Sequence, residues 1–169
     1  MNMLYFFHGM EASPQGTKAQ FLRKHYPDII IPELPPDIYK RIEIINNLVT
    51  EPAYLIGSSL GGLSALFFAM EKPDLVKEMI LLAPAVGFSD PEFFNARDLK
   101  KINSTLIPAG IPCVIMAGEE DDVIPLEDIR ALVSRSPARN QIKLLTVKDN
   151  HSLNQSLDLL ITLVKEMVN

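Results

Sequence analysis

The sequence predicts an α/β fold: a three-layer sandwich in which a doubly wound, mostly parallel sheet of about six strands lies between two layers of helices. Short apolar runs alternate along the chain with longer amphipathic runs. The apolar runs are continuous, as expected for parallel strands that are covered on both faces. The amphipathic runs are long enough to provide the crossover connections that parallel neighbours require.

The apolar runs give the expected strands in chain order. They are Met3–Phe7, Asp28–Ile31, Ala53–Gly57, Glu78–Ala83, Pro112–Ala117 and Ile142–Val147. Open sheets of this class bind their ligands beyond the carboxyl ends of the strands. We therefore expect any chemistry to lie in the residues that directly follow these runs.

The amphipathic runs give the expected helices. They are Thr17–His25, Asp37–Thr50, Ser59–Met70, a helix near Leu126–Ser134, and Ser152–Val168. Between Ile38 and Val49, aliphatic residues recur at the helical period, which indicates one buried face. The stretch Val86–Gly110 shows neither clear pattern and is the longest segment without an assigned element.

Length and composition limit the class of protein. We expect residues 1–169 to form a single domain without a separate cap domain, because 169 residues fit one domain. The hydrophobic fraction of 47% is that of a globular chain. The net charge of -5, with no cluster of Lys and Arg, argues against a nucleic-acid partner, since phosphate binding needs clustered cations.

The sequence also bears on compartment and cofactors. The N-terminus lacks the basic start and long apolar stretch of a signal peptide, and no apolar run approaches the ~20 residues that span a membrane. We therefore expect a soluble cytoplasmic protein without a membrane partner. The one cysteine, Cys113, is expected to be a buried strand residue. No cluster of residues has metal-ligand spacing, so we expect neither a metal nor a cofactor.

Ser59 is the candidate nucleophile. It is the central residue of a G-x-S-x-G motif that begins at Gly57 and ends at Gly61, between an expected strand and an expected helix. Small residues are needed at both glycine positions because the chain turns sharply there, and the serine hydroxyl is left exposed at the tip. The pentapeptide alone also fits an ordinary Gly/Ser turn, but its position between strand and helix favours a nucleophile.

His151 is the candidate general base. A serine hydroxyl needs a base to accept its proton, and the sequence has three histidines. In hydrolases with this motif the residues follow in the order serine, acid, histidine, and only His151 lies after Ser59. His25 falls within an expected helix and is assigned to the surface or to packing.

The acid is expected in the run Glu119–Asp122, which follows an expected strand. The spacing G-x-x-D-x-x-[VI]-P selects Asp121, whose role would be to hold the tautomer of the imidazole and stabilise its cation. Asp122 is the second choice. Asp90, which follows the fourth expected strand, is the third.

An oxyanion hole would complete the site. One donor is expected from the backbone N–H of Leu60, directly after the nucleophile, and the other from the N–H of Met10 in the loop after the first strand. His8 and Gly9 in that loop would then border the substrate. Phe88, Phe93 and Phe94 belong to the Val86–Gly110 stretch, for which lining the substrate pocket and packing over the sheet edge have about equal weight; substrate contacts are assigned to Phe88 and Phe93.

The opening Leu4–Pro14 resembles that of small cap-less bacterial esterases of the YqiA type, in the α/β-hydrolase superfamily. An apolar strand leads into His-Gly and a Ser-Pro loop, and Lys18-Ala19 matches a step in the helix that follows. The resemblance extends over essentially the whole chain. The family often has glycines before its last histidine, whereas Asp149 and Asn150 stand there in this sequence; asparagine tolerates left-handed backbone angles, so the loop is still expected to form.

The resemblance implies an esterase or thioesterase that acts on a small-molecule substrate with a small to medium acyl group. Ser59, Asp121 and His151 would form its triad, with an acyl-enzyme on Ser59. Two classes of alternative stay open, since fold and triad do not fix the substrate. One is an acyltransferase or carbon–carbon hydrolase, and the other is a non-catalytic binding module on the same fold.

Overall fold

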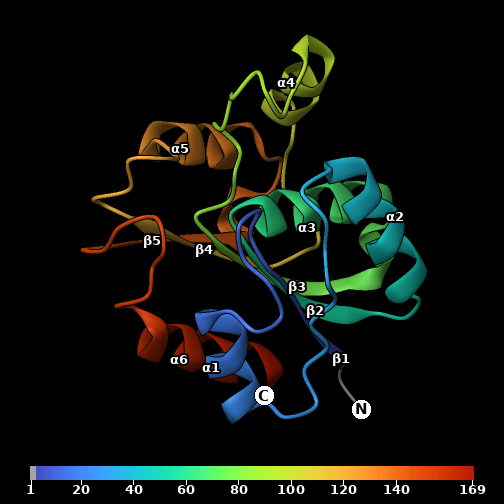
Figure 1. Ribbon diagram of the computed structural model, residues 1–169, viewed down its shortest axis with the longest axis vertical. Helices are drawn as coiled ribbons and strands as arrows, with labels where there is room; N and C mark the ends of the chain where they lie inside the picture. Colours follow the sequence, from blue (N-terminus) through green and yellow to red (C-terminus); the bar gives the residue numbers. More distant parts are fainter. Residues whose placement is uncertain (1–2) are drawn as a thin grey trace.

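The computed structural model describes residues 3–169 and contains a parallel sheet with the strand order β1-β2-β3-β4-β5 (Figure 1). The strands are β1 (Met3–Phe7), β2 (Ala53–Ser58), β3 (Val76–Leu82), β4 (Cys113–Gly118) and β5 (Ile142–Val147). All neighbouring strands pair in parallel. The predicted α/β class with a parallel sheet between helices is therefore confirmed.

The prediction of a strand at Asp28–Ile31 is wrong, because the sheet formed within residues 3–169 has five strands and not six. Only Ile30 pairs there, in an isolated parallel bridge to Tyr5 of β1. Its N–H donates to the carbonyl of Leu4 at 2.9 Å, and its carbonyl accepts from the N–H of Phe6 at 3.0 Å. Pro32 follows closely, and proline cannot donate to a ladder, so the pairing does not extend along the sheet edge.

In the described part of the chain, six α-helices connect and follow the strands. They are α1 (Thr17–His25), α2 (Ile38–Leu48), α3 (Leu60–Glu71), α4 (Ala96–Asn103), α5 (Leu126–Arg135) and α6 (Leu157–Val168), and two short 3-10 turns, η1 (Pro73–Leu75) and η2 (Arg139–Gln141), precede β3 and β5. The bounds of α1 and β5 are those predicted. The last helix begins at Leu157 and not at Ser152, and α4 was not predicted.

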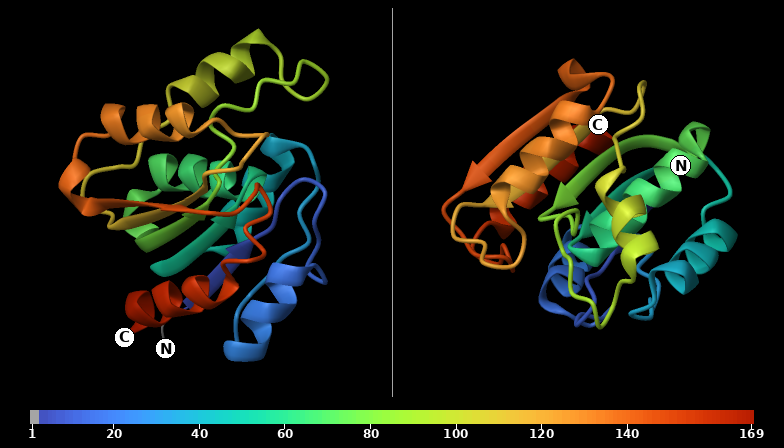
Figure 2. Two further views of the ribbon diagram at one scale, coloured as in Figure 1. Left: turned by 90° about the vertical axis from the view of Figure 1, so that its left-hand side faces the viewer. Right: turned by 90° about the horizontal axis from the view of Figure 1, so that it is seen from above.

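The helices form two layers, one on each face of the sheet. Helices α1 and α6 cover one face, whereas α2, α3 and α5 cover the other (Figures 1 and 2). The alternation of side chains along β1 shows this division directly. Leu4 and Phe6 belong to the apolar cluster under α1 and α6, and Tyr5 and Phe7 belong to the cluster under α2, α3 and α5.

Helix α4 lies farther from the sheet, beyond α3 and α5 (Figures 1 and 2). It begins with a capping box, in which the side chains of Asn95 and Asp98 each accept the other residue's backbone N–H. Asp98 also accepts a hydrogen bond of 2.5 Å from the Tyr39 hydroxyl of α2, and this bond lowers the pKa of its carboxyl. Ile102 is buried in the apolar cluster under α2, α3 and α5 and attaches the helix to it.

Two further expectations concern the cysteine and membrane-spanning helices. Cys113 is 1% exposed at the start of β4, as predicted, and burial raises the pKa of its thiol. Among the described residues, no helix combines the length and the apolar character that crossing a membrane requires.

Candidate active site

Ser59 occupies the turn between β2 and α3 with backbone angles of φ 54° and ψ −116°. A residue with a side chain rarely adopts a positive φ, and the surrounding structure must hold it there. The N–H of Ser59 donates to the carbonyl of Leu82 at 2.8 Å, and its carbonyl accepts from the N–H groups of Gly62, Leu63 and Ala85. Contacts from the end of β3 and the first turn of α3 thus fix the strained residue.

The two motif glycines are required by close packing. A Cβ atom at Gly57 would lie 2.5 Å from the carbonyl oxygen of Gly61, and a Cβ atom at Gly61 would overlap the carbonyl group of Phe7 in β1. Real Cβ atoms do not approach other atoms so closely. The prediction that small residues are needed at both positions is confirmed, and the contacts show that a side chain would collide with the neighbouring helix or strand.

His151 lies between Ser59 and Asp121. Its Nε2 atom is 3.0 Å from the Ser59 Oγ, and its Nδ1 atom is 2.8 Å from the Asp121 Oδ2. A carboxylate can only accept, so Nδ1 carries the imidazole proton and the lone pair of Nε2 faces the serine hydroxyl. The side chain of His151 is 24% exposed and that of Asp121 is 2% exposed. The structure therefore brings the three sequence-selected side chains into one hydrogen-bonded chain.

Asp121 is oriented by the turn that follows β4. Its second carboxylate oxygen accepts the N–H groups of Val123 at 2.8 Å and Ile124 at 2.9 Å. The two other candidate acids lie apart from the imidazole: Asp122 is exposed, and Asp90 accepts the N–H of Glu92 in its own loop. Of the three candidates, Asp121 alone contacts His151.

The loop that carries His151 is held by a residue that the sequence analysis did not select. Asp149 is 1% exposed, and its carboxylate accepts the hydroxyl of Ser156 at 2.9 Å and the N–H of Gln155 at 3.0 Å. Asn150 similarly accepts the N–H of Ser152. The left-handed residue of this loop is Leu153, with a φ of 54°. Side-chain hydrogen bonds thus hold this loop, and Asn150 is not its left-handed residue.

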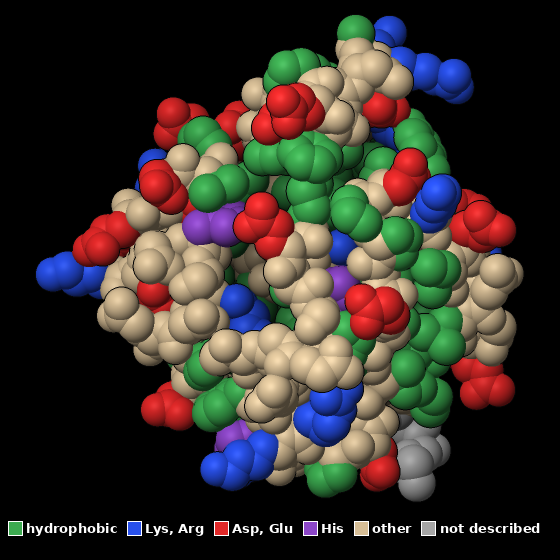
Figure 3. All heavy atoms as spheres, viewed as in Figure 1, with side chains coloured by type: hydrophobic (Ala, Val, Ile, Leu, Met, Phe, Trp, Pro, Cys, Tyr) green, Lys and Arg blue, Asp and Glu red, His purple; other side chains and the backbone are tan. Residues whose placement is uncertain are grey.

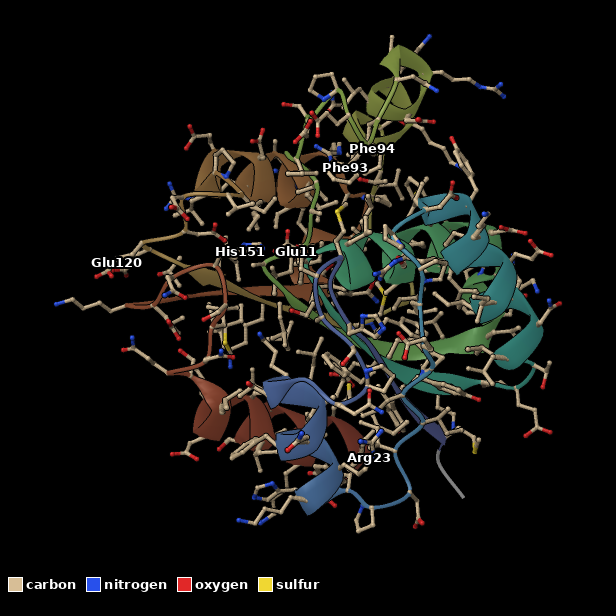
Figure 4. The ribbon with its side chains drawn as sticks, in the orientation of Figure 1. Glu11, Arg23, Phe93, Phe94, Glu120 and His151 are labelled. Carbon is tan, nitrogen blue, oxygen red and sulfur yellow. The ribbon has the colours of Figure 1, made fainter. Side chains whose placement is uncertain are left out.

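A cavity of about 550 Å³ opens around Ser59. Its walls include Gly9, Met10, Glu11, Lys18, Leu60, Phe88, Asp90, Phe93, Val123 and His151. In Figure 4, Phe93 lies at the base of α4, above Glu11 and His151. Figure 3 shows hydrophobic side chains gathered on this face below α4, close to a surface histidine. The structure thus places Gly9, Phe88 and Phe93 at the cavity, whereas Phe94 is buried behind them.

His8 is absent from the lining of this cavity and borders instead a neighbouring cavity of about 260 Å³, which shares Gly9, Lys18 and Ser58 with the first. Its side chain is 1% exposed, Nδ1 is 2.8 Å from the Gly9 carbonyl, and Nε2 accepts the N–H of Leu34 at 3.1 Å. An N–H group can only donate, so His8 is neutral with its proton on Nδ1. Burial is the main reason that its pKa lies below the ordinary value. His8 is therefore part of the support behind the loop.

The backbone N–H groups of Met10 and Leu60 remain available to a ligand. Both residues line the cavity, and neither N–H donates to another group within residues 3–169. Leu60 also begins α3, so the positive end of the helix dipole lies next to Ser59. Together the two amides could bind a negatively charged oxygen near Ser59.

The charged side chains at the cavity do not form a metal site. No group of three His, Cys, Asp or Glu side chains in the part of the chain that the structure describes could hold a metal ion. Lys18 adds a positive charge to the cavity wall; its Nζ atom lies 3.4 Å from the Asn154 side-chain oxygen, and burial lowers the pKa of its ammonium.

Comparison with solved structures gives hydrolases of the same fold. Alpha/beta hydrolase domain-containing protein 10 from mouse superposes with a TM-score of 0.80 at 17% identity, over 98% of this chain and 88% of that one. Est1E from Butyrivibrio proteoclasticus gives 0.73 at 18% identity, over 99% and 86%. The monoacylglycerol lipase of Paleococcus ferrophilus gives 0.74 at 13% identity, over 98% and 93%.

Sequence comparison places the chain more narrowly. A search of curated proteins gave no match. The model of the Esterase family, described as "Putative esterase", matches residues 7–153, which include Ser59, Asp121 and His151. The hydrolase fold and this match over most of the sequence agree with each other. The chain belongs to the Esterase family of α/β-hydrolases.

Proposed function

We propose that this protein is a serine esterase that hydrolyses carboxylic esters or thioesters of small to medium acyl groups through an acyl-enzyme on Ser59. The observation that carries the proposal is the hydrogen-bonded chain from Asp121 through His151 to Ser59 at the cavity. Membership of the Esterase family supports the same class of reaction.

Acylation uses the geometry around Ser59. The Nε2 atom of His151 accepts the hydroxyl proton while the Ser59 Oγ attacks the substrate carbonyl carbon. Asp121 accepts the hydrogen bond from the Nδ1–H group of His151 and stabilises the imidazolium that forms. The protonated His151 then donates its proton to the leaving alkoxide or thiolate, and an acyl ester of Ser59 remains.

Deacylation repeats these steps with water in place of the serine. His151 accepts a proton from water, the resulting hydroxide attacks the acyl carbon, and the Ser59 oxygen leaves with the proton returned by His151. In both steps the carbonyl oxygen becomes negatively charged. The N–H groups of Met10 and Leu60 would stabilise it, and each such donor typically lowers the barrier by about 3 kcal/mol.

The cavity suggests where the acyl group lies. Phe88 and Phe93 provide an apolar wall, and their rings are 6.1 Å apart between centroids. A cavity of about 550 Å³ is within the range of small-molecule sites and has room for a modest acyl chain. We therefore assign the acyl chain to the side of the cavity formed by these aromatic residues.

A fluorophosphonate probe tests the nucleophile directly, because it phosphonylates activated serines. We expect the folded wild type to be labelled and Ser59→Ala to remain unlabelled. Ser58→Ala is the matched control, since Ser58 also lines the cavity but bonds to neither His151 nor Asp121, and it should be labelled. A folded wild type that is not labelled would contradict the proposal.

Matched substrates then define the bond that is cleaved. p-Nitrophenyl esters and acyl-CoA thioesters of the same chain lengths should be compared with unlabelled enzyme, at equal concentrations of active sites titrated with the fluorophosphonate in a separate sample. Hydrolysis of either series that is lost in Ser59→Ala supports the proposal, and the ratio of kcat/KM between the series gives the preference. A wild type that is labelled but hydrolyses neither series would exclude this substrate class.

A further inference from the structure

Arg41, in the first half of α2, is a fully buried cation without an anionic partner. Its exposed fraction is 0%, and it forms no ion pair within the described residues 3–169. The guanidinium donates instead to backbone carbonyls: Nε to Pro35 at 2.5 Å, one terminal nitrogen to His8 at 2.6 Å and the other to Gly9 at 2.9 Å. Two of its three acceptors thus belong to the loop after β1.

Packing alone does not explain a charge at this position. Burying a cation without a counter-ion is costly, and apolar side chains of similar volume often fill such positions equally well. Burial lowers the pKa of Arg41 to about 10, so the group still carries its charge at neutral pH. The planar guanidinium offers several fixed donors, which suits it to hold several carbonyls in a set orientation.

The Gly9 carbonyl connects Arg41 to the candidate oxyanion hole. It accepts from Arg41 and also lies 2.8 Å from the protonated Nδ1 of His8. In a planar trans peptide the carbonyl and the N–H of the next residue point in opposite directions. Fixing the Gly9 carbonyl towards Arg41 therefore turns the Met10 N–H away from it.

Gly9 also lies close to Ser59. A Cβ atom added to Gly9 would lie 3.5 Å from the Ser59 Cβ, so the loop passes directly beside the nucleophile. Gly9 and Met10 both line the cavity. We infer that Arg41 is a positioning residue, which orients the Gly9–Met10 peptide so that its N–H donates to the oxyanion. The inference rests on the proposed function, because it assigns a role in that same reaction.

Transition-state and ground-state measurements separate this role from a structural one. For Arg41→Met we expect kcat per active site, titrated with the fluorophosphonate, to fall about 10²-fold, the loss typical of one oxyanion donor. KM should change less than about threefold. The Ki of an aryl trifluoromethyl ketone, which binds as an oxyanion adduct of the serine, should rise by about the same factor as kcat falls.

Arg135 provides the matched control. Its guanidinium also donates to a backbone carbonyl, that of Thr105, and burial also lowers its pKa, but neither residue lines the cavity. Arg135→Met should lower the midpoint of urea unfolding and leave kcat per titrated site and the inhibitor Ki unchanged. Arg41→Lys should retain part of the activity, because an ammonium keeps the charge but not the fixed fork of donors.

Chemical rescue covers the case in which Arg41→Met folds poorly. Arg41→Ala leaves space for a free guanidinium ion, and millimolar guanidinium should raise its kcat while leaving Arg135→Ala unaffected. The inference is overturned if the Arg41 variants keep wild-type kcat per titrated site and an unchanged inhibitor Ki, or if guanidinium does not raise kcat. A wild type that lacks hydrolysis would instead refute the proposed function and, with it, this role.

Discussion

The two walls of the cavity around Ser59 are built in different ways. The sheet wall consists of Gly9, Met10, Ser59, Leu60 and His151, which follow the carboxyl ends of β1, β2 and β5. The α4 wall consists of Phe88, Asp90 and Phe93, from the segment that leads into α4. The first is fixed by buried backbone contacts, whereas Phe93 in the second is 47% exposed.

The difference suggests a division of roles. Bond cleavage needs donors and acceptors fixed to within a fraction of an ångström, which buried strand ends can provide. Choice of acyl group needs mainly apolar surface of suitable shape, which Phe88 and Phe93 supply through ring contacts with each other and with Phe94. We therefore expect substitutions in the sheet wall to affect rate or folding, and substitutions in the α4 wall to affect preference among substrates.

The largest effect is expected for the acid behind the sheet wall. Asp121→Asn keeps the shape of the side chain but favours the wrong imidazole tautomer, so kcat for a p-nitrophenyl ester should fall about 10⁴-fold. Asp122→Asn is the control, because Asp122 is exposed and does not contact His151. Equal losses in the two variants would show that the sheet wall does not depend on the Asp121–His151 hydrogen bond.

A large effect on folding is expected at Gly61. In Gly61→Ala the new methyl group overlaps the Phe7 carbonyl, and we expect a loss of about 4 kcal/mol or more in the free energy of unfolding, measured with urea. Gly110→Ala is the control: Gly110 has a φ of 90° but open space around its Cα, so only about 1 to 2 kcal/mol of backbone strain applies. A Gly61→Ala protein of wild-type stability would mean that β1 and α3 can separate at little cost.

A smaller effect on stability is expected when low pH protonates His8, the buried residue that supports the loop of the sheet wall. The pKa of His8 in the folded protein lies below its unfolded value of about 6.5, mainly because the ring is buried. The neutral ring thus contributes stability that is fully present above about pH 6.5 and is lost as the pH falls towards the folded pKa. Between the two pKa values, protonation of His8 should lower the free energy of unfolding by up to about 1.4 kcal/mol per pH unit.

His8→Gln isolates this contribution from the other titrating groups. Urea unfolding at pH 7.5, 6.5, 5.5 and 5.0 should show a shallower decline for the variant than for the wild type, because only the wild type gains a proton at this position on unfolding. Parallel declines would mean that the His8 ring is as free to take up a proton in the folded protein as in the unfolded chain.

The smallest effect on rate is expected in the α4 wall. Phe93→Ala should change the ratio of kcat/KM between short and longer p-nitrophenyl esters several-fold, which corresponds to about 1 kcal/mol, the lower end of what pocket contacts contribute. Phe94→Ala is the matched control, since its ring is 3% exposed and its loss should reduce stability by about 3 kcal/mol. If Phe93→Ala left the preference among acyl chain lengths unchanged, the acyl group would not bind against this wall.

Features with a local cause could be predicted from the sequence. The bounds of α1 and β5 follow from hydrophobic patterning, and the tight turn at Gly57 and Gly61 follows from the space that a strand-to-helix turn allows. The spacing after β4 also selected Asp121, the acid that the structure places against His151. These inferences succeed because the signal for each lies in one short stretch of the sequence.

Features that depend on distant partners were missed. Arg41 acts on carbonyls that lie far before it in the chain, so its own sequence surroundings show only an amphipathic helix. Asp149 stands beside Lys148 with no local signal of burial, yet it is 1% exposed in the fold. Asn95 and Asp98 have the spacing of a capping box, which is a local signal for α4, but the helix is short and has few buried residues. The segment Asp28–Ile31 likewise lies at the edge of the sheet, beside β1, and forms only a single bridge.

The most direct test of the account is to trap the acyl group on the sheet wall. Wild type should be mixed with p-nitrophenyl trimethylacetate, whose bulky acyl group slows deacylation, then quenched in acid and examined by mass spectrometry after digestion. The account predicts one trimethylacetyl group per active site, on Ser59, and none in Ser59→Ala. Hydrolysis of this ester by Ser59→Ala at the wild-type rate, or an acyl group on another residue, would contradict it.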